Sequence, residues 1–256
     1  MHDTLTSKRN KTWTPVHESM IRLYLDISID LRLNRIAKDG LHQYRNLTLS
    51  QNVQSLEKVL MHFIDASEAK ASEAKIASGA DLSMEATDLE EIESPEAMLL
   101  STTTSENSRD RTAHTHVVPW LRFLWEAYRT VLDILKFNSQ LEGLYVRLAN
   151  RAFTFCLKYK RKIEFRRLCE VLRMHLGTIE KHLMAPTAQS MKQMRMWEGW
   201  SPESVERHLT LRYEQLRVST TLEHWTEAFR TIEDIHAVIH ILPNTKINWW
   251  RIITNN

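Results

Sequence analysis

The chain has 256 residues, of which 43% are hydrophobic, so it is long enough to bury a core; its net charge of +2 points to no particular partner. It contains only five glycines and six prolines. Because glycine is needed for tight turns and for close approach of the backbone to phosphates, this scarcity disfavours sheet-rich folds and glycine-loop nucleotide sites. Good helix formers dominate the remaining sequence, and we predict an all-α protein.

Residues 1–65 are predicted to form N-terminal helical repeats. Thr14 followed by Pro15 is typical of a helix start, because threonine caps free amides and proline suits the first helical position. Apolar residues then recur every three or four positions as far as Asp39 and Gly40, where glycine is predicted to end the helix. Two shorter helices are predicted over 41–47 and 55–64.

The next segment, residues 66–117, is predicted to be an acidic, low-complexity linker. Between Ala66 and Ser108 there are ten acidic residues against two lysines, and Ala-Ser-Glu-Ala-Lys occurs twice in tandem. Its first part can extend the preceding helix as a solvated tail. Ser94 followed by Pro95 predicts a brief helix before a Ser/Thr-rich loop.

Residues 118–241 carry the strongest helical pattern. Helices are predicted over 119–137, 141–159, 162–183, 202–219 and 222–241, the last with an apolar pattern formed by Trp225, Ala228, Phe229, Ile232 and Ile235. Short breaks between helices imply antiparallel pairs, and two successive pairs resemble each other, which favours a TPR-like solenoid of stacked helix pairs. Any antiparallel bundle gives a similar pattern, so a plain bundle stays open. Residues 242–256 are predicted to be a separate C-terminal tail.

No catalytic motif or cofactor-binding loop is recognisable, and we predict a protein that is not an enzyme and binds no cofactor. His114 and His116 lie near Asp110 but lack an evident third ligand, so no metal site is expected. Cys156 and Cys169 fall on apolar helix stretches and are predicted to be buried thiols. No apolar run long enough to span a membrane is seen, and the expected compartment is the cytoplasm.

One cluster of positive charge brackets a predicted helix junction. Basic residues with interleaved aromatics can bind phosphates and stack on bases, which makes this cluster a candidate RNA contact. The alternative is that the cations stabilise a helix C-terminus and solvate an exposed face. The members are Lys158, Lys160, Arg161, Lys162, Arg166, Arg167 and Arg173.

Trp197 and Trp200 lie in a methionine-rich loop. Tryptophan is enriched at binding hot spots, so the pair is a candidate contact for a protein partner. Burial of both rings against the chain's own helices is the competing interpretation.

Many short segments, in order and at similar spacing, resemble the N-terminal helical-repeat region of the largest subunit of eukaryotic translation initiation factor 3. In the first half these are Thr12-Trp13, His17-Glu18, Asp30-Leu31-Arg32, Ala37-Lys38-Asp39-Gly40-Leu41, Gln43-Tyr44-Arg45-Asn46, Ser55-Leu56-Glu57, Ser94-Pro95-Glu96, Leu99-Leu100 and Asp110-Arg111-Thr112. In the second half they are Pro119-Trp120, Phe123-Leu124-Trp125-Glu126, Tyr128-Arg129, Phe155-Cys156-Leu157, Glu164-Phe165-Arg166-Arg167-Leu168-Cys169, Leu172-Arg173-Met174-His175-Leu176, Trp225, Glu227-Ala228-Phe229 and Glu233-Asp234-Ile235-His236. The resemblance runs from about Lys11 to Ile241.

This resemblance implies a non-catalytic scaffold. Members of the family pair with the other subunits of initiation factor 3, help recruit mRNA and work on the small ribosomal subunit. Their helical repeats lead into a winged-helix half, which together form the PCI module, and then into a charged tail. The stretch after Ile241 does not match, so the resemblance implies a fragment. A scaffold of another PCI assembly, the proteasome lid or the signalosome, and an autonomous RNA-binding module are the alternatives.

Overall fold

The computed structural model describes residues 12–49, 51–78, 88–90, 108–184 and 196–240. Every regular element in these ranges is a helix, which confirms the predicted all-α class. None of these helices combines the length and the apolar character needed to cross a membrane. The chain divides into two compact units, Met1–Ile134 (unit 1) and Leu135–Asn256 (unit 2).

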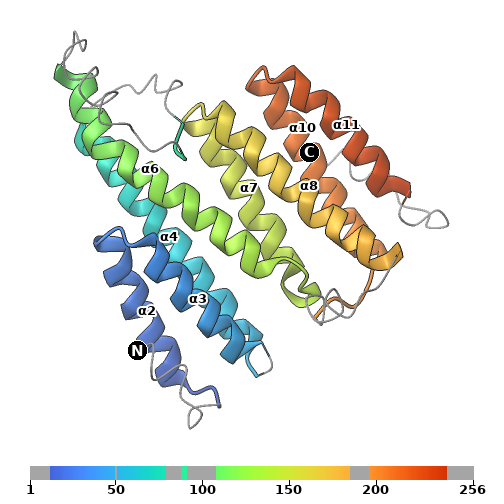
Figure 1. Cartoon of the computed structure of the whole chain (residues 1–256), viewed down its shortest axis with the longest axis horizontal. Helices are drawn as coiled ribbons and strands as arrows, with labels where there is room; N and C mark the ends of the chain where they lie inside the picture. Colours follow the sequence, from blue (N-terminus) through green and yellow to red (C-terminus); the bar gives the residue numbers. More distant parts are fainter. Residues whose placement is uncertain (1–11, 50, 79–87, 91–107, 185–195, 241–256) are drawn as a thin grey trace. The chain divides into compact units, whose positions relative to one another are not determined.

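Unit 1 is built from α2 (Pro15–Asp30), α3 (Asn34–Thr48), α4 (Val53–Ser78) and α6 (Ser108–Leu135, whose last residue falls in unit 2). Helix α2 packs against both α3 and α4 (Figure 1). Phe63 of α4 meets Phe123 of α6 edge to face, with ring centroids 6.1 Å apart. The short segment 88–90 is fixed on α6, where Trp125 Nε1 donates to Glu90 Oε1 at 2.8 Å and Arg122 Nε to the Leu89 carbonyl at 2.9 Å.

Unit 2 contains the short 3-10 turn η1 (Ser139–Leu141), α7 (Glu142–Lys158), α8 (Lys162–Met184), α10 (Pro202–Thr221) and α11 (Trp225–His240). Helix α10 packs against both α7 and α11, and α8 contacts α7 and α11 (Figure 1). One apolar cluster joins α8, α10 and α11 through Leu176, Val205, Leu209, Ile235 and Val238, all buried. Within unit 2 the α7/α8 pair therefore buries apolar side chains against the α10/α11 pair, as expected for helical repeats.

Three helix pairs, α2/α3, α7/α8 and α10/α11, are joined by the same turn. In each, one residue after the first helix takes a positive φ: Arg32 at 54°, Lys160 at 51° and Glu223 at 57°. The residue after it closes the turn by donating its amide to the last turn of that helix, at 2.8 Å in all three: Leu33 to Ser28, Arg161 to Cys156 and His224 to Ser219. The second helix then begins two residues after the positive-φ position. This shared geometry supports the predicted repeat relation between α7/α8 and α10/α11.

Replacing Glu223 with glycine should stabilise unit 2 by about 0.5–1 kcal/mol, because a left-handed conformation is costly for a residue with a Cβ and free for glycine. The matched control is Glu233→Gly, in the exposed interior of α11, which should destabilise by about 0.5–1 kcal/mol because glycine weakens helices. Urea unfolding of both variants measures the two shifts. A destabilising Glu223→Gly change would show that this turn carries no strain.

The predicted helix from Pro15 to Gly40 is wrong, as is the separate helix over 41–47. The start at Pro15 is confirmed, but the chain turns at Arg32, and α3 runs through Gly40 without a break. Gly40 is buried inside α3, and a Cβ there would lie 2.5 Å from Cε1 of Tyr24 on α2. Its small size therefore serves the close approach of α2 and α3, rather than a helix end.

The predicted linker over 66–117 is also too long. Helix α4 continues to Ser78, and Ser67 and Ala71 on this extension are buried, so it is not merely a solvated tail. At the other end, α6 begins at Ser108 and carries Pro119 inside it. The brief helix predicted after Ser94 and the tail 242–256 lie outside the described residues, as do most of the linker's acidic side chains.

Candidate functional site

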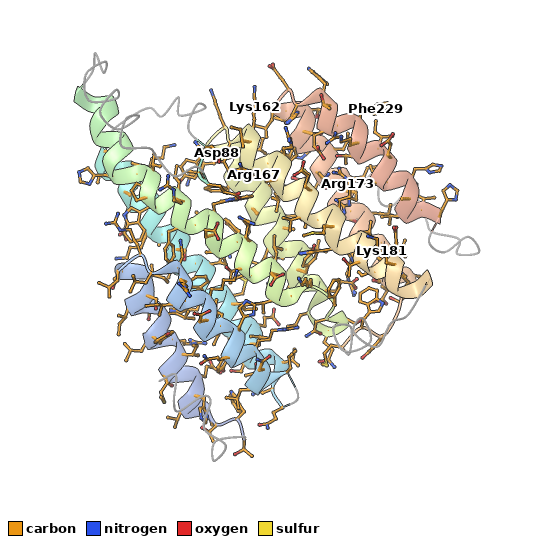
Figure 2. All side chains as sticks on the ribbon, viewed as in Figure 1. Asp88, Lys162, Arg167, Arg173, Lys181 and Phe229 are labelled. Carbon is orange, nitrogen blue, oxygen red and sulfur yellow. The ribbon has the colours of Figure 1, made fainter. Side chains whose placement is uncertain are left out.

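The predicted cationic cluster spans the end of α7, its turn and the first half of α8. Lys158, Lys160, Lys162 and Arg166 are exposed, and Arg167 is partly buried. Lys158 lies over the ring of Tyr159, 5.3 Å from the centroid, and Arg166 pairs with Glu170 one turn along α8 at 3.4 Å. Figure 2 labels Lys162, Arg167 and Arg173 along α8. These five cations occupy the surface of one helix junction.

Arg161 differs from its neighbours because its side chain points into the protein. It is 1% exposed, and so is Glu164, whose carboxylate accepts two hydrogen bonds from its guanidinium, at 3.1 Å from Nε and 2.8 Å from Nη2. A planar guanidinium matches a carboxylate in this paired geometry. Arg161 therefore forms a buried ion pair.

Arg173 also serves the interior of unit 2. From α8 it reaches two buried carboxylates of α11: its Nε lies 2.8 Å from Asp234 Oδ1, its Nη2 2.9 Å from Asp234 Oδ2 and 2.6 Å from Glu227 Oε1. Burial lowers the pKa of Arg173, but the hydrogen bonds and charges of Asp234 and Glu227 outweigh it and raise the pKa above its usual range. The guanidinium thus joins α8 to α11.

A second buried arginine extends this network from α10. Arg212 is 1% exposed and donates through Nη1 to Gln215 Oε1 at 2.6 Å, and Gln215 in turn donates to Thr231 Oγ1 of α11 at 2.8 Å. The same Nη1 lies 3.8 Å from Asp234. The sequence analysis did not find the members of this network on α10 and α11. They meet only when three helices pack together, and no local sequence pattern indicates such contacts.

These placements correct the predicted cluster of seven cations. Arg161 and Arg173 are held by protein carboxylates, so they are not part of an exposed phosphate-binding face. Neither residue fits the alternative of helix-end or solvated charge, because both pair with carboxylates inside unit 2. RNA contact stays a prediction for Lys158, Lys160, Lys162, Arg166 and Arg167.

A second polar cluster surrounds Glu142 at the start of α7. Its carboxylate accepts hydrogen bonds from Ser204 and, at 3.1 Å, from Arg207, and lies 3.1 Å from His208 Nε2, all on α10. Burial raises the pKa of Glu142, but hydrogen bonds from His208, Ser204 and Arg207 and the charge of His208 outweigh burial and lower it. The ionised carboxylate therefore stabilises the α7–α10 contact.

We expect acid to weaken unit 2 through Glu142. A carboxylate whose folded pKa is lowered contributes stability above its unfolded pKa, and that contribution is lost as pH falls through the folded pKa. Glu142→Gln should therefore lower stability at pH 7 and flatten the loss of stability on acidification. Urea unfolding at a series of pH values tests this, with the exposed Glu203→Gln as control. Equal pH profiles for wild type and Glu142→Gln would contradict it.

Glu142 and His208 also line a small cavity of ≈ 20 Å³, together with Tyr145, His175, Trp197 and Arg212 among others. Tyr145 is buried and hydrogen-bonds His175 Nδ1 at 3.0 Å, and burial raises its pKa far above the usual range. A space of this size holds about one water molecule, not a substrate.

The tryptophan pair predicted to contact a partner packs within unit 2. Trp197 and Trp200 meet edge to face with centroids 5.2 Å apart, and Trp200 stacks similarly on His208 at 5.1 Å. Trp200 also packs against the apolar cluster of α8, α10 and α11. The two half-buried rings therefore have a packing role, and contact of either ring with a partner stays a prediction.

A more exposed apolar surface lies on α11. Trp225 and Phe229 are each 66% exposed and Ile232 is 53% exposed, at the three/four spacing of one helix face (Figure 2 labels Phe229). The sequence pattern grouped them with Ala228 and Ile235, which are buried. Helix α11 therefore has two apolar faces, one packed on α10 and one open to solvent; we call the second, formed by Trp225, Phe229 and Ile232, the α11 outer face.

Histidine and cysteine are side chains that can bind a metal ion or react as a nucleophile, and the described ranges contain both. Within them no group of three or more histidine, cysteine or acidic side chains is placed to hold a metal ion. The side chain of His114 lies outside what the structure describes, and that of His116 is exposed. Cys156 and Cys169 are free and buried, as predicted, and burial raises the pKa of both thiols. Both cysteines are thus core residues.

Comparison with known proteins identifies the helical array. A family model described as "eIF3a, PCI domain, TPR-like region" matches residues 1–248. The A subunit of eukaryotic translation initiation factor 3 from Aspergillus clavatus is 45% identical over 251 residues, which cover 94% of this chain and 23% of that protein. The protein of the same name from Danio rerio is 41% identical over 238 residues, covering 93% of this chain and 18% of that protein.

The chain thus spans less than a quarter of the length of these relatives. The match extends slightly beyond the residues that carried the sequence resemblance, since it includes residues 1–10 and 242–248. Because the family model covers nearly the whole chain and agrees with its paired helices, the chain belongs to the eIF3a family and comprises its PCI-domain, TPR-like region.

Proposed function

We propose that this chain is a non-catalytic scaffold segment of translation initiation factor 3, which supports assembly of the initiation complex on the small ribosomal subunit in the cytoplasm. The observation that carries this proposal is the family match over residues 1–248. Stacked helix pairs offer extended surfaces for protein contacts, which suits a scaffold. The match to eIF3a leaves no observation in favour of a proteasome-lid or signalosome subunit.

Contact with other subunits of the factor is proposed for the α11 outer face. Aromatic side chains that lie exposed on one helix face are the residue types that dominate binding hot spots. Trp225 and Phe229 bury little of their surface in unit 2. A partner that covers this apolar surface therefore gains the free energy of removing it from water.

Affinity purification of the tagged chain tests the proposal. We expect recovery of initiation factor 3 subunits, and Trp225→Ser with Phe229→Ser should reduce it. The matched control is Ile76→Ser with Met174→Ser, which removes two exposed apolar side chains elsewhere. Absence of factor subunits with the wild-type chain would overturn the scaffold proposal, whereas equal recovery by the two double variants would overturn only the role of the α11 outer face.

A second proposed activity, contact with mRNA or ribosomal RNA, rests on the five exposed or partly exposed cations at the α7–α8 junction. Lys162→Glu, Arg166→Glu and Arg167→Glu together should weaken RNA binding and reduce its salt dependence, because each phosphate contact releases counterions. The control is Arg147→Glu, Lys181→Glu and Arg217→Glu, the same charge change at exposed sites elsewhere in unit 2. Unchanged RNA affinity and salt slope in the first variant would rule out this face.

A further inference from the structure

The C-terminal part of α11 carries two exposed histidines, His236 and His240, four residues apart. Side chains at this spacing lie on the same side of a helix. Their rings are tilted by 58° with centroids 4.3 Å apart, and their Nε2 atoms lie 3.0 Å apart. At this distance the two nitrogens share a hydrogen bond, and a metal ion bound to both can replace the shared proton. Paired histidines at this helical spacing bind a common metal ion in other proteins.

The separation of the two Nε2 atoms is compatible with one coordination geometry in particular. Imidazole nitrogens bind divalent transition metals at about 2.0–2.1 Å. Two such bonds meeting at about 90° place the nitrogens roughly 2.9–3.0 Å apart, whereas a tetrahedral angle of about 109° needs roughly 3.3–3.4 Å. The observed 3.0 Å fits the right-angled case. Square-planar or tetragonal geometry of this kind is preferred by Cu(II) and Ni(II).

The fold holds in place the helix that carries the two rings. Val238, between them in sequence, is fully buried, and Ile235 packs in the same apolar cluster of unit 2. The buried side of α11 therefore fixes the helix while the two histidines face solvent. His240 is the last residue of α11, where the negative end of the helix dipole favours a bound cation.

The geometry points to a surface site for Cu(II) or Ni(II) on α11, in which His236 and His240 provide two adjacent equatorial nitrogens. Each ring binds as the neutral imidazole through Nε2, with its proton on Nδ1. Among the described residues no third histidine, cysteine or carboxylate joins the pair, so water fills the remaining positions. The site is independent of the proposed scaffold function, since it requires only a folded α11.

Titration of the whole chain with Cu(II) and Ni(II), followed by calorimetry and by the electron paramagnetic resonance of Cu(II), tests this site. We expect one saturable site with two equatorial nitrogens and an affinity order of Cu(II), then Ni(II), then Zn(II). His236→Ala and His240→Ala should each weaken binding about tenfold or more, because even residues that only support a ligand change metal affinity by about 10–100-fold. His224→Ala, at the other end of α11, should leave it unchanged.

Both substituted residues are exposed, so circular dichroism should show an intact helical fold in every variant. Three results would each overturn the site: no saturable binding by the wild-type chain, retention of full affinity when both histidines are replaced, or tighter binding of Zn(II) than of Cu(II). If the double alanine variant loses both metal binding and helical signal, His236→Gln with His240→Gln is measured in its place. Restored helicity without metal binding supports the site, and restored binding overturns it.

Discussion

Replacing Arg173 with methionine should destabilise unit 2 by about 3–5 kcal/mol, the cost of removing one partner from a buried ion pair. Asp234 and Glu227 are 8% and 1% exposed, and Arg173 is their nearest cation, since Arg212 and Arg230 each stay 3.8 Å from one of them. Hydrogen exchange of α8, α10 and α11 amides should rise together, because Arg173 joins α8 to α11 while Arg212 approaches the same carboxylate from α10. Urea unfolding gives the size of the effect.

Arg166→Met is the control, since Arg166 lies on the same helix but is exposed, and it should change stability by no more than about 0.5 kcal/mol. Adding Asp234→Asn and Glu227→Gln to Arg173→Met removes the stranded charges and should restore part of the loss. If Arg173→Met unfolds at the same urea concentration as wild type, the guanidinium is not what holds α8 against α11.

Arg161→Met should be similarly damaging, by about 3–5 kcal/mol, because it leaves Glu164 buried without its guanidinium. The expected signature is a lower urea midpoint and faster hydrogen exchange at the α7–α8 turn. Replacing both residues by apolar ones, Arg161→Met with Glu164→Leu, should recover much of the stability, because well-packed apolar side chains often substitute for a buried ion pair.

Lys162→Met is the control for Arg161→Met, since it removes a neighbouring positive charge that is exposed. It should leave stability nearly unchanged. The comparison also separates structure from RNA contact: Lys162→Met is expected to weaken RNA binding without unfolding, whereas Arg161→Met acts through folding. Equal stability of the two variants would show that burial of Arg161 contributes little to the fold.

Much of the helical array could be predicted from sequence because its signals are local. Ser201 before Pro202 predicted the start of α10, and the Ser201 hydroxyl accepts a hydrogen bond from the Ser204 amide at 3.1 Å. The same reasoning placed the start of α2 at Pro15. From Pro119 onward, long apolar periodicities predicted α6, α7, α8, α10 and α11. Most of the helix ends that the structure describes lie within a few residues of the predicted ones.

The α2/α3 turn was missed because its residues carry no breaker signal. Leu31, Arg32 and Leu33 read as continuing helix, yet Arg32 adopts the left-handed conformation that glycine usually marks. At Gly40 a helix end was predicted where the helix continues, because this glycine allows close packing against Tyr24. Both features depend on how α2 meets α3, which local propensity does not contain.

The candidate site was predictable only in part for the same reason. Charge clustering found the exposed cations at the α7–α8 junction. Charge clustering could not distinguish Arg173 from these exposed cations, because the partners of Arg173 lie 54 and 61 residues away in sequence. For Arg161 a signal existed, because Glu164 follows three residues later at helical spacing. The open side of α11 could not be told from its buried side, since both are apolar.

The turn shared by the three helix pairs has a consequence for how the chain is made. Each turn is closed by a hydrogen bond between residues only five positions apart, so the hairpin forms without waiting for distant sequence. A growing chain can therefore close each of these turns as soon as the residues of that helix pair have left the ribosome. Formation of the hairpins would then keep pace with synthesis, one helix pair after another.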